Sequence, residues 1–238
     1  MPKRLFRPVL LSACASLALA CAAGAAAQMP PNAGAGNAAS NAAFAAGQKK
    51  AEAQGGDWAA HLRRFEAAYF KANPVFAVGQ GRHEFDGRLP DWSAKAIRQQ
   101  IAWLEQQRKA AAAFADVTLA PPQRFERDYL LARIDGDLFW LRDAQQPSRN
   151  PAFYAGWLDP SVYLTRPYAP LATRMKAFIA YARAVPKAMT QMRANLKTPL
   201  PKTYVELGIN SFGGYASFFG QDVQPIFAEV KDAALQAQ

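Results

Sequence analysis

The fold is decided by residues 171–196, LATRMKAFIAYARAVPKAMTQMRANL. Its apolar side chains recur at steps of three and four positions, at Leu171, Met175, Phe178, Ala182, Val185, Met189, Met192 and Leu196. This spacing places them on one face of an α-helix. Pro186 lies inside the pattern, and we expect the helix to kink or restart there because proline removes an intrahelical hydrogen bond. The stretch therefore predicts a long amphipathic helix with one buried face.

The same periodicity extends to both sides of this stretch. Asp57 can cap a helix that ends before Pro74, and a loop follows. Ser93 can cap a second helix, with Ile97, Ile101 and Leu104 on one face. Pro121 and Pro122 open a third, which carries Leu131, Ile134, Leu138 and Leu141 and is locally weakened by Gly136. Two last helices are expected at 204–219 and 223–235, the second with Val223, Phe227, Val230 and Ala234 facing inward.

No run of alternating β-branched residues appears, so no strand is expected. Residues 57–238 are predicted to form an all-α domain, an irregular array of about six to eight helices.

The first 56 residues differ from the rest in composition. Lys3, Arg4 and Arg7 precede the apolar segment 9–23, and an Ala-rich cleavage motif ends at Ala27, so residues 1–27 are predicted to be a signal peptide. Lipid attachment at Cys14 or Cys21 is a less favoured alternative. Residues 28–56 are rich in Ala, Gly, Asn and Pro and are predicted to be a flexible linker. The protein is thus expected to be exported, periplasmic or secreted, without a transmembrane span in its mature form.

Charge and composition exclude several functions. The formal net charge of +10 falls to +7 once the three cations of the predicted signal peptide are removed. The remaining cations form no block longer than two, and the protein is exported, so nucleic-acid binding is not expected. Two Cys and two His in the whole chain exclude a disulfide framework and any complete zinc site rich in Cys or His.

Familiar catalytic motifs are also incomplete. His83-Glu84 would need a second His four positions after the first, where Gly87 stands, and the other histidine, His61, is expected at the surface or at a boundary. Ser211 lacks the flanking glycines of a nucleophile elbow; the nearby glycines are interpreted as close helix contacts or a bend. The carboxylate pairs Asp86/Asp91 and Asp135/Asp137 are more simply explained by surface pairing with arginines. No catalytic residue and no metal ligand is predicted.

Residues 74–93, PVFAVGQGRHEFDGRLPDWS, resemble the N-terminal signature of a bacterial family, the domain of unknown function 885 family. Further similar stretches follow in the same order: Asn150-Pro151 with Phe153-Tyr154, residues 163–171 (YLTRPYAPL), Arg183 to Pro186, and Asn195-Leu196 through Pro199. The resemblance covers the chain from about Asp57 onward.

The resemblance implies exported or lipoprotein-like, largely helical proteins similar to zinc metallopeptidases, with a His-Glu metal motif in their later half. The present chain would correspond to the N-terminal half, one wall of a cleft for a peptide substrate, so zinc is expected only together with the later half. His83, Asp86, Arg88 and Asp91 are then candidates for lining the cleft, although a role in fixing the loop, with Asp86 and Asp91 as turn residues, is the favoured explanation.

Two functions remain open. The chain is either the N-terminal portion of a metallopeptidase-like hydrolase, not catalytic alone, or a self-sufficient exported helical module. Such a module would bind a protein or envelope polymer through a basic, aromatic surface that includes Tyr154, Trp157 and Tyr163. An extended exposed apolar patch would favour the first.

Overall fold

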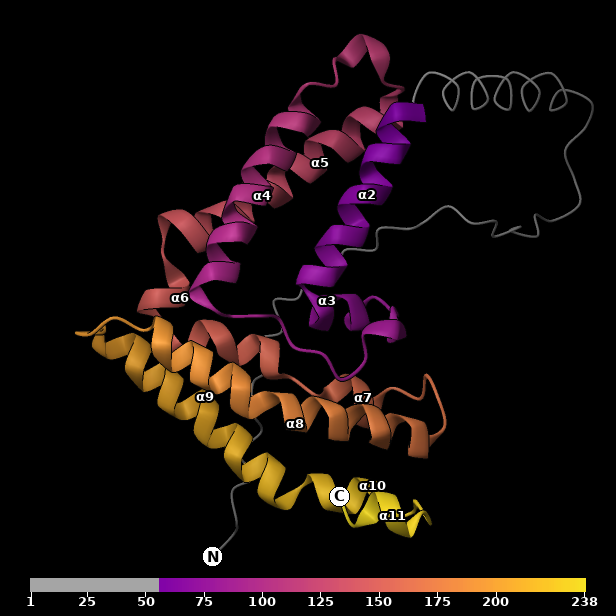
Figure 1. Cartoon of the computed structure of the whole chain (residues 1–238), viewed down its shortest axis with the longest axis vertical. Helices are drawn as coiled ribbons and strands as arrows, with labels where there is room; N and C mark the ends of the chain where they lie inside the picture. Colours follow the sequence, from indigo (N-terminus) through magenta and orange to yellow (C-terminus); the bar gives the residue numbers. More distant parts are fainter. Residues whose placement is uncertain (1–55) are drawn as a thin grey trace, which may run out of the picture. The chain divides into compact units, whose positions relative to one another are not determined.

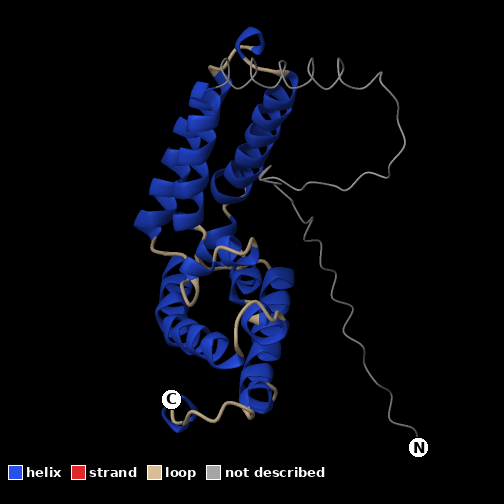
Figure 2. Ribbon diagram, turned by 90° about the vertical axis from the view of Figure 1, so that its right-hand side faces the viewer, coloured by secondary structure: helices blue, strands red, loops and turns tan. Residues whose placement is uncertain are grey.

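A computed structural model describes residues 56–238 (Figures 1 and 2). The predicted signal peptide, Cys14, Cys21 and residues 28–55 of the predicted linker lie outside the described residues. The α-helices are α2 (Gly56–Ala72), α3 (Pro74–Gly79), α4 (Ala94–Ala112), α5 (Pro121–Leu138), α6 (Gln146–Arg149), α7 (Ser161–Thr165), α8 (Leu171–Asn195), α9 (Lys202–Gln221), α10 (Val223–Phe227) and α11 (Ala233–Gln236). The shorter turns η1 (His83–Phe85), η2 (Asp116–Thr118) and η4 (Pro151–Leu158) are 3-10 helices, and η3 (Phe139–Asp143) is a π-helix. Residues 56–238 contain no strand, which confirms the all-α prediction.

Helices α2, α4 and α5 pack around one hydrophobic cluster (Figure 1). Leu104 of α4 and Ile134 of α5 are completely buried there, as the sequence pattern predicts. Ser93 caps α4, because its hydroxyl accepts a hydrogen bond from the Ala96 amide at 3.2 Å. Trp58 of α2 is also buried and donates its indole N–H to Glu126 of α5 at 2.9 Å.

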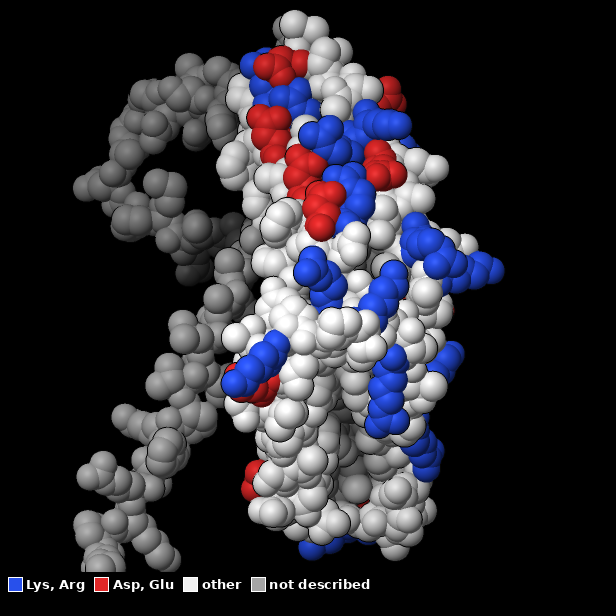
Figure 3. Space-filling view, turned by 90° about the vertical axis from the view of Figure 1, so that its left-hand side faces the viewer, with Lys and Arg blue, Asp and Glu red and all other residues white. Residues whose placement is uncertain are grey.

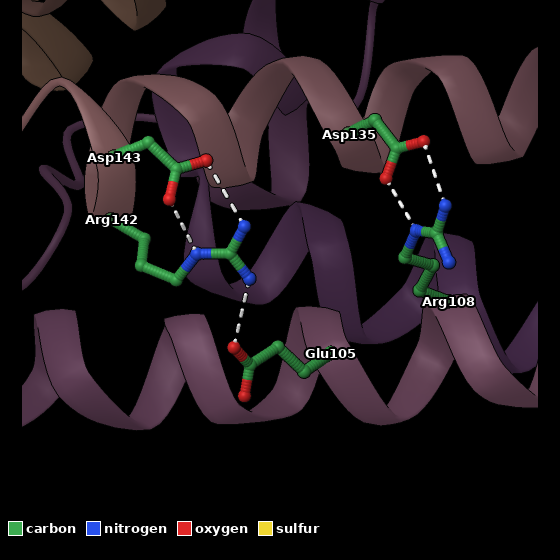
Figure 4. Close-up of polar contacts among 5 residues, drawn as sticks. All are labelled: Glu105, Arg108, Asp135, Arg142 and Asp143. Atoms are coloured by element: carbon green, nitrogen blue, oxygen red, sulfur yellow. Dashed lines mark hydrogen bonds and ion pairs between the residues drawn. The ribbon is translucent and has the colours of Figure 1, made fainter.

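Ion pairs on the surface join α4 to α5 and η3 (Figure 4). The Arg108 guanidinium lies 2.5 Å from the Asp135 carboxylate. The Arg142 guanidinium bridges Glu105 and Asp143, at 3.0 and 2.8 Å. All five side chains are 43–50% exposed, so solvent screens these pairs.

The second group of helices consists of α6, α7, α10 and α11, which pack against α8. Met175, Phe178 and Met192 are buried as predicted, but Tyr181 takes the position expected for Ala182, which is exposed. The Tyr181 hydroxyl donates to the Leu158 carbonyl of η4 at 2.8 Å, so this side chain ties α8 to the preceding turn. Helix α8 runs unbroken through Pro186, and the restart predicted there does not occur.

Two other sequence expectations are wrong in detail. The segment after α2 is not a plain loop, because Pro74 opens the short helix α3, a position that proline favours. The helix expected at 223–235 is two short helices, since the Asp232 carboxylate caps a new one by accepting hydrogen bonds from the Ala234 and Leu235 amides. Leu235 is therefore buried, and Ala234 is exposed.

Candidate functional site

A pocket of about 450 Å³ lies where α2, α4 and α5 meet the segment 90–92 and the turns η3 and η4. We call it the α5 pocket, because Ala132, Arg133, Gly136 and Asp137 of α5 line it. Its volume is within the range of about 300–1,000 Å³ typical of small-molecule sites.

A hydrogen-bonded triad of Tyr69, Arg133 and Asp137 forms part of the pocket wall. The Tyr69 hydroxyl donates to the Asp137 carboxylate at 2.8 Å and accepts from the Arg133 guanidinium at 2.6 Å. Arg133 also lies 3.4 Å from Asp137, one helical turn along α5. The guanidinium carbon is 5.6 Å from the centre of the Tyr69 ring and 5.5 Å from that of Phe76. These contacts hold the three polar groups in a fixed arrangement.

Burial shifts the titration of two members of the triad. It raises the pKa of the Asp137 carboxyl above its ordinary value, although Arg133 and the Tyr69 hydroxyl act in the opposite direction. Burial, and next the negative charge of Asp137, raise the pKa of the Tyr69 hydroxyl. Tyr69 therefore remains a neutral hydrogen-bond donor at physiological pH, and Asp137 takes up a proton more readily than an exposed aspartate.

Two amide side chains extend this polar wall. Asn73 is buried and donates to the Tyr69 carbonyl at 3.0 Å, and Gln100 of α4 donates to the Asn73 side-chain oxygen at 3.4 Å. Both line the α5 pocket.

Aromatic side chains supply the rest of the lining. Trp92 comes from the segment 90–92, and Trp140 comes from η3. Turn η4 contributes Phe153 and Trp157. Trp140 is 50% exposed, whereas Trp92 is only 5% exposed. The pocket thus combines flat apolar faces with amide, carboxylate, phenol and guanidinium groups.

The four residues proposed from the sequence lie elsewhere, and none of them lines the α5 pocket. His83 and Asp86 do come together, with His83 Nδ1 3.1 Å from the Asp86 carboxylate. The His83 ring stacks on Tyr168 at a centroid distance of 3.6 Å, and the Tyr168 hydroxyl donates to Asp86 at 2.9 Å. Their role as cleft-lining groups remains a prediction.

Arg88 and Asp91 do not join that cluster. The Arg88 guanidinium carbon lies 5.6 Å from the Phe85 ring centre. The Asp91 carboxylate accepts hydrogen bonds from the Ser93 amide at 2.9 Å and from the Gln191 side chain at 2.7 Å. These hydrogen bonds lower the pKa of the Asp91 carboxyl. Asp91 thus acts as a turn residue in front of α4 and ties this turn to α8.

Other sequence expectations about reactive or surface residues need correction. His61 is buried at 6% exposure, not at the surface, and is stacked on Trp58. Tyr154 and Tyr163 are buried too, so they cannot belong to a binding surface. Asp135 and Asp137 each pair with an arginine, as expected, but only the pair of Asp135 with Arg108 is at the surface, since Asp137 pairs with Arg133 in the wall of the α5 pocket.

Two further observations concern metals and membranes. In residues 56–238, no three side chains of His, Cys, Asp or Glu are grouped closely enough to hold a metal ion. The helices of this described part are too short or too polar to cross a membrane.

Charge is unevenly distributed on the surface. On the face shown in Figure 3, Lys and Arg alternate with Asp and Glu in the upper part of the view. Farther down the same face, isolated Lys and Arg side chains stand on a mostly uncharged surface. This face therefore carries no continuous basic stripe of the kind expected for nucleic-acid binding.

Sequence reasoning missed the polar residues of the α5 pocket. Tyr69 and Asp137 are 68 positions apart, and no local motif links them. Gly136 gave a weak signal as a helix-disfavouring residue inside the α5 pattern. A Cβ added there would meet no atom within 4 Å, and the residue lines the pocket.

The comparisons with known proteins agree with this fold. A solved structure, described as "a putative lipoprotein of unknown function" from Shewanella oneidensis, superimposes with a TM-score of 0.65 at 18% sequence identity. The match covers 74% of the present chain but only 32% of that protein, so the present chain spans about a third of its length. No curated protein sequence matches the chain. Residues 74–238 match the model of the family described as "Bacterial protein of unknown function (DUF885)", and the chain therefore belongs to this family, as its sequence signature indicates.

Proposed function

We propose that residues 57–238 form the N-terminal helical portion of an exported, metallopeptidase-like hydrolase. In this proposal they contribute one wall of a cleft for a peptide substrate, and the zinc site lies outside them. The chain is then not catalytic alone.

The surface of α9 carries this proposal. Among the residues of α9, all of which the structure describes, only Gly208 is buried. A Cβ there would meet the Pro151 ring at 2.9 Å, so Gly208 marks the side of the helix that packs on η4. Leu207 and Ile209 are 52% and 66% exposed, and a Cβ added at Gly213, Gly214 or Gly220 would meet no atom within 4 Å. Exposed apolar side chains and uncovered glycines in a 20-residue helix suit packing against a further part of a larger fold.

The relative from Shewanella oneidensis supports the same interpretation, because its chain is about three times as long as the part that the present chain matches. Its length supports a larger protein built onto the helical part described here, whereas the hydrolase chemistry rests on the resemblance to metallopeptidases.

The first test is the native product in its host, detected with an antibody raised against residues 57–238 and located by cell fractionation. We expect a species much heavier than 26.0 kDa in the envelope or medium. A species slightly lighter than 26.0 kDa would contradict the proposal, and N-terminal sequencing would then test removal of residues 1–27.

A second test addresses α9 directly. The isolated chain should bind an apolar dye and self-associate, and Ile209→Ser together with Leu207→Ser should reduce both effects. Val117→Ser is the matched control, because Val117 is 90% exposed but lies far along the chain from α9. A monomeric chain without dye binding would count against the proposal.

The alternative is a self-sufficient exported module that binds a protein or an envelope polymer. The α5 pocket is the observation that favours it, because residues of the described part of the chain supply both aromatic and polar lining groups. A cooperatively melting monomer with a ligand in that pocket would support this function.

A further inference from the structure

We propose that the α5 pocket binds an uncharged sugar ring of a glycan. The proposal goes beyond the hydrolase function and does not depend on it, because no residue of α9 lines the pocket. It rests on the charges, the aromatic surfaces and the hydrogen-bonding groups of the lining.

The charges favour a neutral ligand. Arg133 and Asp137 are the charged residues among the described residues that line the pocket, and they lie 3.4 Å apart. Because each of these charges is compensated by the other, neither an anionic nor a cationic ligand gains a net electrostatic attraction from the pair. An uncharged ligand needs no such attraction and can still hydrogen-bond to both groups.

The aromatic residues favour a flat apolar surface on the ligand. Trp92, Trp140, Phe153 and Trp157 all contribute to the lining. A sugar ring has C–H groups on its faces that can pack against aromatic rings, whose faces carry partial negative charge. Trp140, half-exposed, can adapt to such a ring without losing packing in the core.

The polar residues favour hydroxyl groups around the rim of the ligand. Asn73 and Gln100 each carry an amide donor and acceptor, Arg133 supplies donors, and Asp137 supplies acceptors. They come from the end of α2, from α4 and from α5, and the hydrogen bonds among Gln100, Asn73 and the triad place them side by side on one polar wall of the pocket. Neighbouring hydroxyls of a sugar ring are each donor and acceptor, so they can pair with these adjoining donors and acceptors, while the ring face packs on the aromatic residues.

Gly136 provides a way to block the pocket without removing any contact. A side chain at this position would enter open space, since no atom lies within 4 Å of an added Cβ. Gly136→Leu should also favour the helix, because glycine costs about 1 kcal/mol relative to good helix formers. Gly213→Leu on α9 is the matched control, since its Cβ also meets nothing within 4 Å and the residue does not line the pocket.

The experiment titrates the full chain calorimetrically with two uncharged trisaccharides, chitotriose and maltotriose, and with an acetylated, amidated dipeptide of alanine and phenylalanine. We expect at least one trisaccharide to bind with a Kd of about 1 mM or lower. Gly136→Leu should weaken this binding by at least about tenfold, and Gly213→Leu should leave it within about twofold.

A second pair of variants separates the aromatic contact from general effects on folding. Trp140 and its neighbour Phe139 are 50% and 51% exposed, but only Trp140 lines the pocket. Trp140→Ala should weaken trisaccharide binding by about tenfold, and Phe139→Ala should change it little. The proposal is overturned if neither trisaccharide binds, if Gly136→Leu binds as tightly as the parent, or if the dipeptide binds in place of the sugars and is blocked by Gly136→Leu.

Discussion

Burial of His61 makes it a point of acid sensitivity. Its Nε2 atom is buried without a hydrogen-bond partner in the described structure, and the ring stacks on Trp58 and meets Phe114 at a tilted angle. Burial, and next the charge of Arg64, lower the pKa of His61 below its ordinary value of 6.5. The folded state therefore holds a proton less readily than the unfolded chain.

We expect the free energy of unfolding to fall as the pH drops through about 6.5, where the unfolded chain takes up a proton that the folded chain does not. The loss should level off below the folded-state pKa. Urea unfolding from pH 8 to 5 measures it, and His61→Phe should flatten the curve in this interval. His83→Gln is the control, and an unchanged slope in His61→Phe would contradict the assignment.

Both the backbone conformation and the close neighbours of Gly87 require a glycine at this position. Its φ is +75°, and a Cβ there would lie 2.6 Å from the Ala180 side chain of α8. We expect Gly87→Ala to destabilise the fold by about 3 kcal/mol, from left-handed strain and overpacking together. Gly81 has a similar φ of +85° but no atom within 4 Å, so Gly81→Ala should cost only about 1 kcal/mol. Equal melting temperatures for the two variants would show that the contact with α8 is unimportant.

At the level of elements, the salt bridges between α4 and η3 should be weak and sensitive to salt. Arg142 joins Glu105 to Asp143, and all three side chains are 43–48% exposed. Arg142→Ala should lower the melting temperature slightly at low ionic strength, and the difference should disappear in 1 M NaCl, where the screening length is about 3 Å. Lys202→Ala, which removes a pair with an 87% exposed lysine, should have no measurable effect at either salt concentration. A difference that persists in 1 M NaCl would indicate packing by the Arg142 stem instead.

Helices with a regular apolar period could be predicted from the sequence. The burial of a side chain or the end of a helix could not be predicted where a contact outside that period decides it. Helices α4 and α5 could be predicted because their apolar period, the Ser93 cap of α4 and the prolines that open α5 are all local features of the sequence. On α8, Tyr181 is buried rather than Ala182 because its hydroxyl reaches the Leu158 carbonyl, 23 positions away. The break between α10 and α11 depends on a cap at Asp232 that the apolar spacing does not reveal.

The same limit applies to the candidate site. The local pair of His83 and Asp86, three residues apart, could be selected from the sequence. The α5 pocket could not, because Tyr69, Gln100, Asp137 and Trp157 come from four separate segments and meet only once these have packed together. The sequence pattern places Tyr69 on the apolar face of its helix and Asp137 among the arginine-paired carboxylates, and neither position reveals the hydrogen bond between them.

At the scale of the whole molecule, the positions of the possible zinc-ligating side chains decide whether residues 56–238 can bind zinc. The two histidines are committed to separate contacts, His61 to Trp58 in the cluster of α2, α4 and α5, and His83 to Asp86 and Tyr168 beside α8. Zinc sites need three or four ligands at about 2.0–2.3 Å, and residues 56–238 bring no three such groups together. If the hydrolase proposal is correct, the metal belongs to a part of the fold that these residues do not supply.

We therefore expect the purified chain, dialysed against micromolar zinc and then against buffer, to retain well below one zinc per molecule by elemental analysis. One tightly held zinc per chain, lost on changing His83 and Asp86 to Ala, would place a metal site in this helical portion and contradict its assignment as a non-catalytic wall.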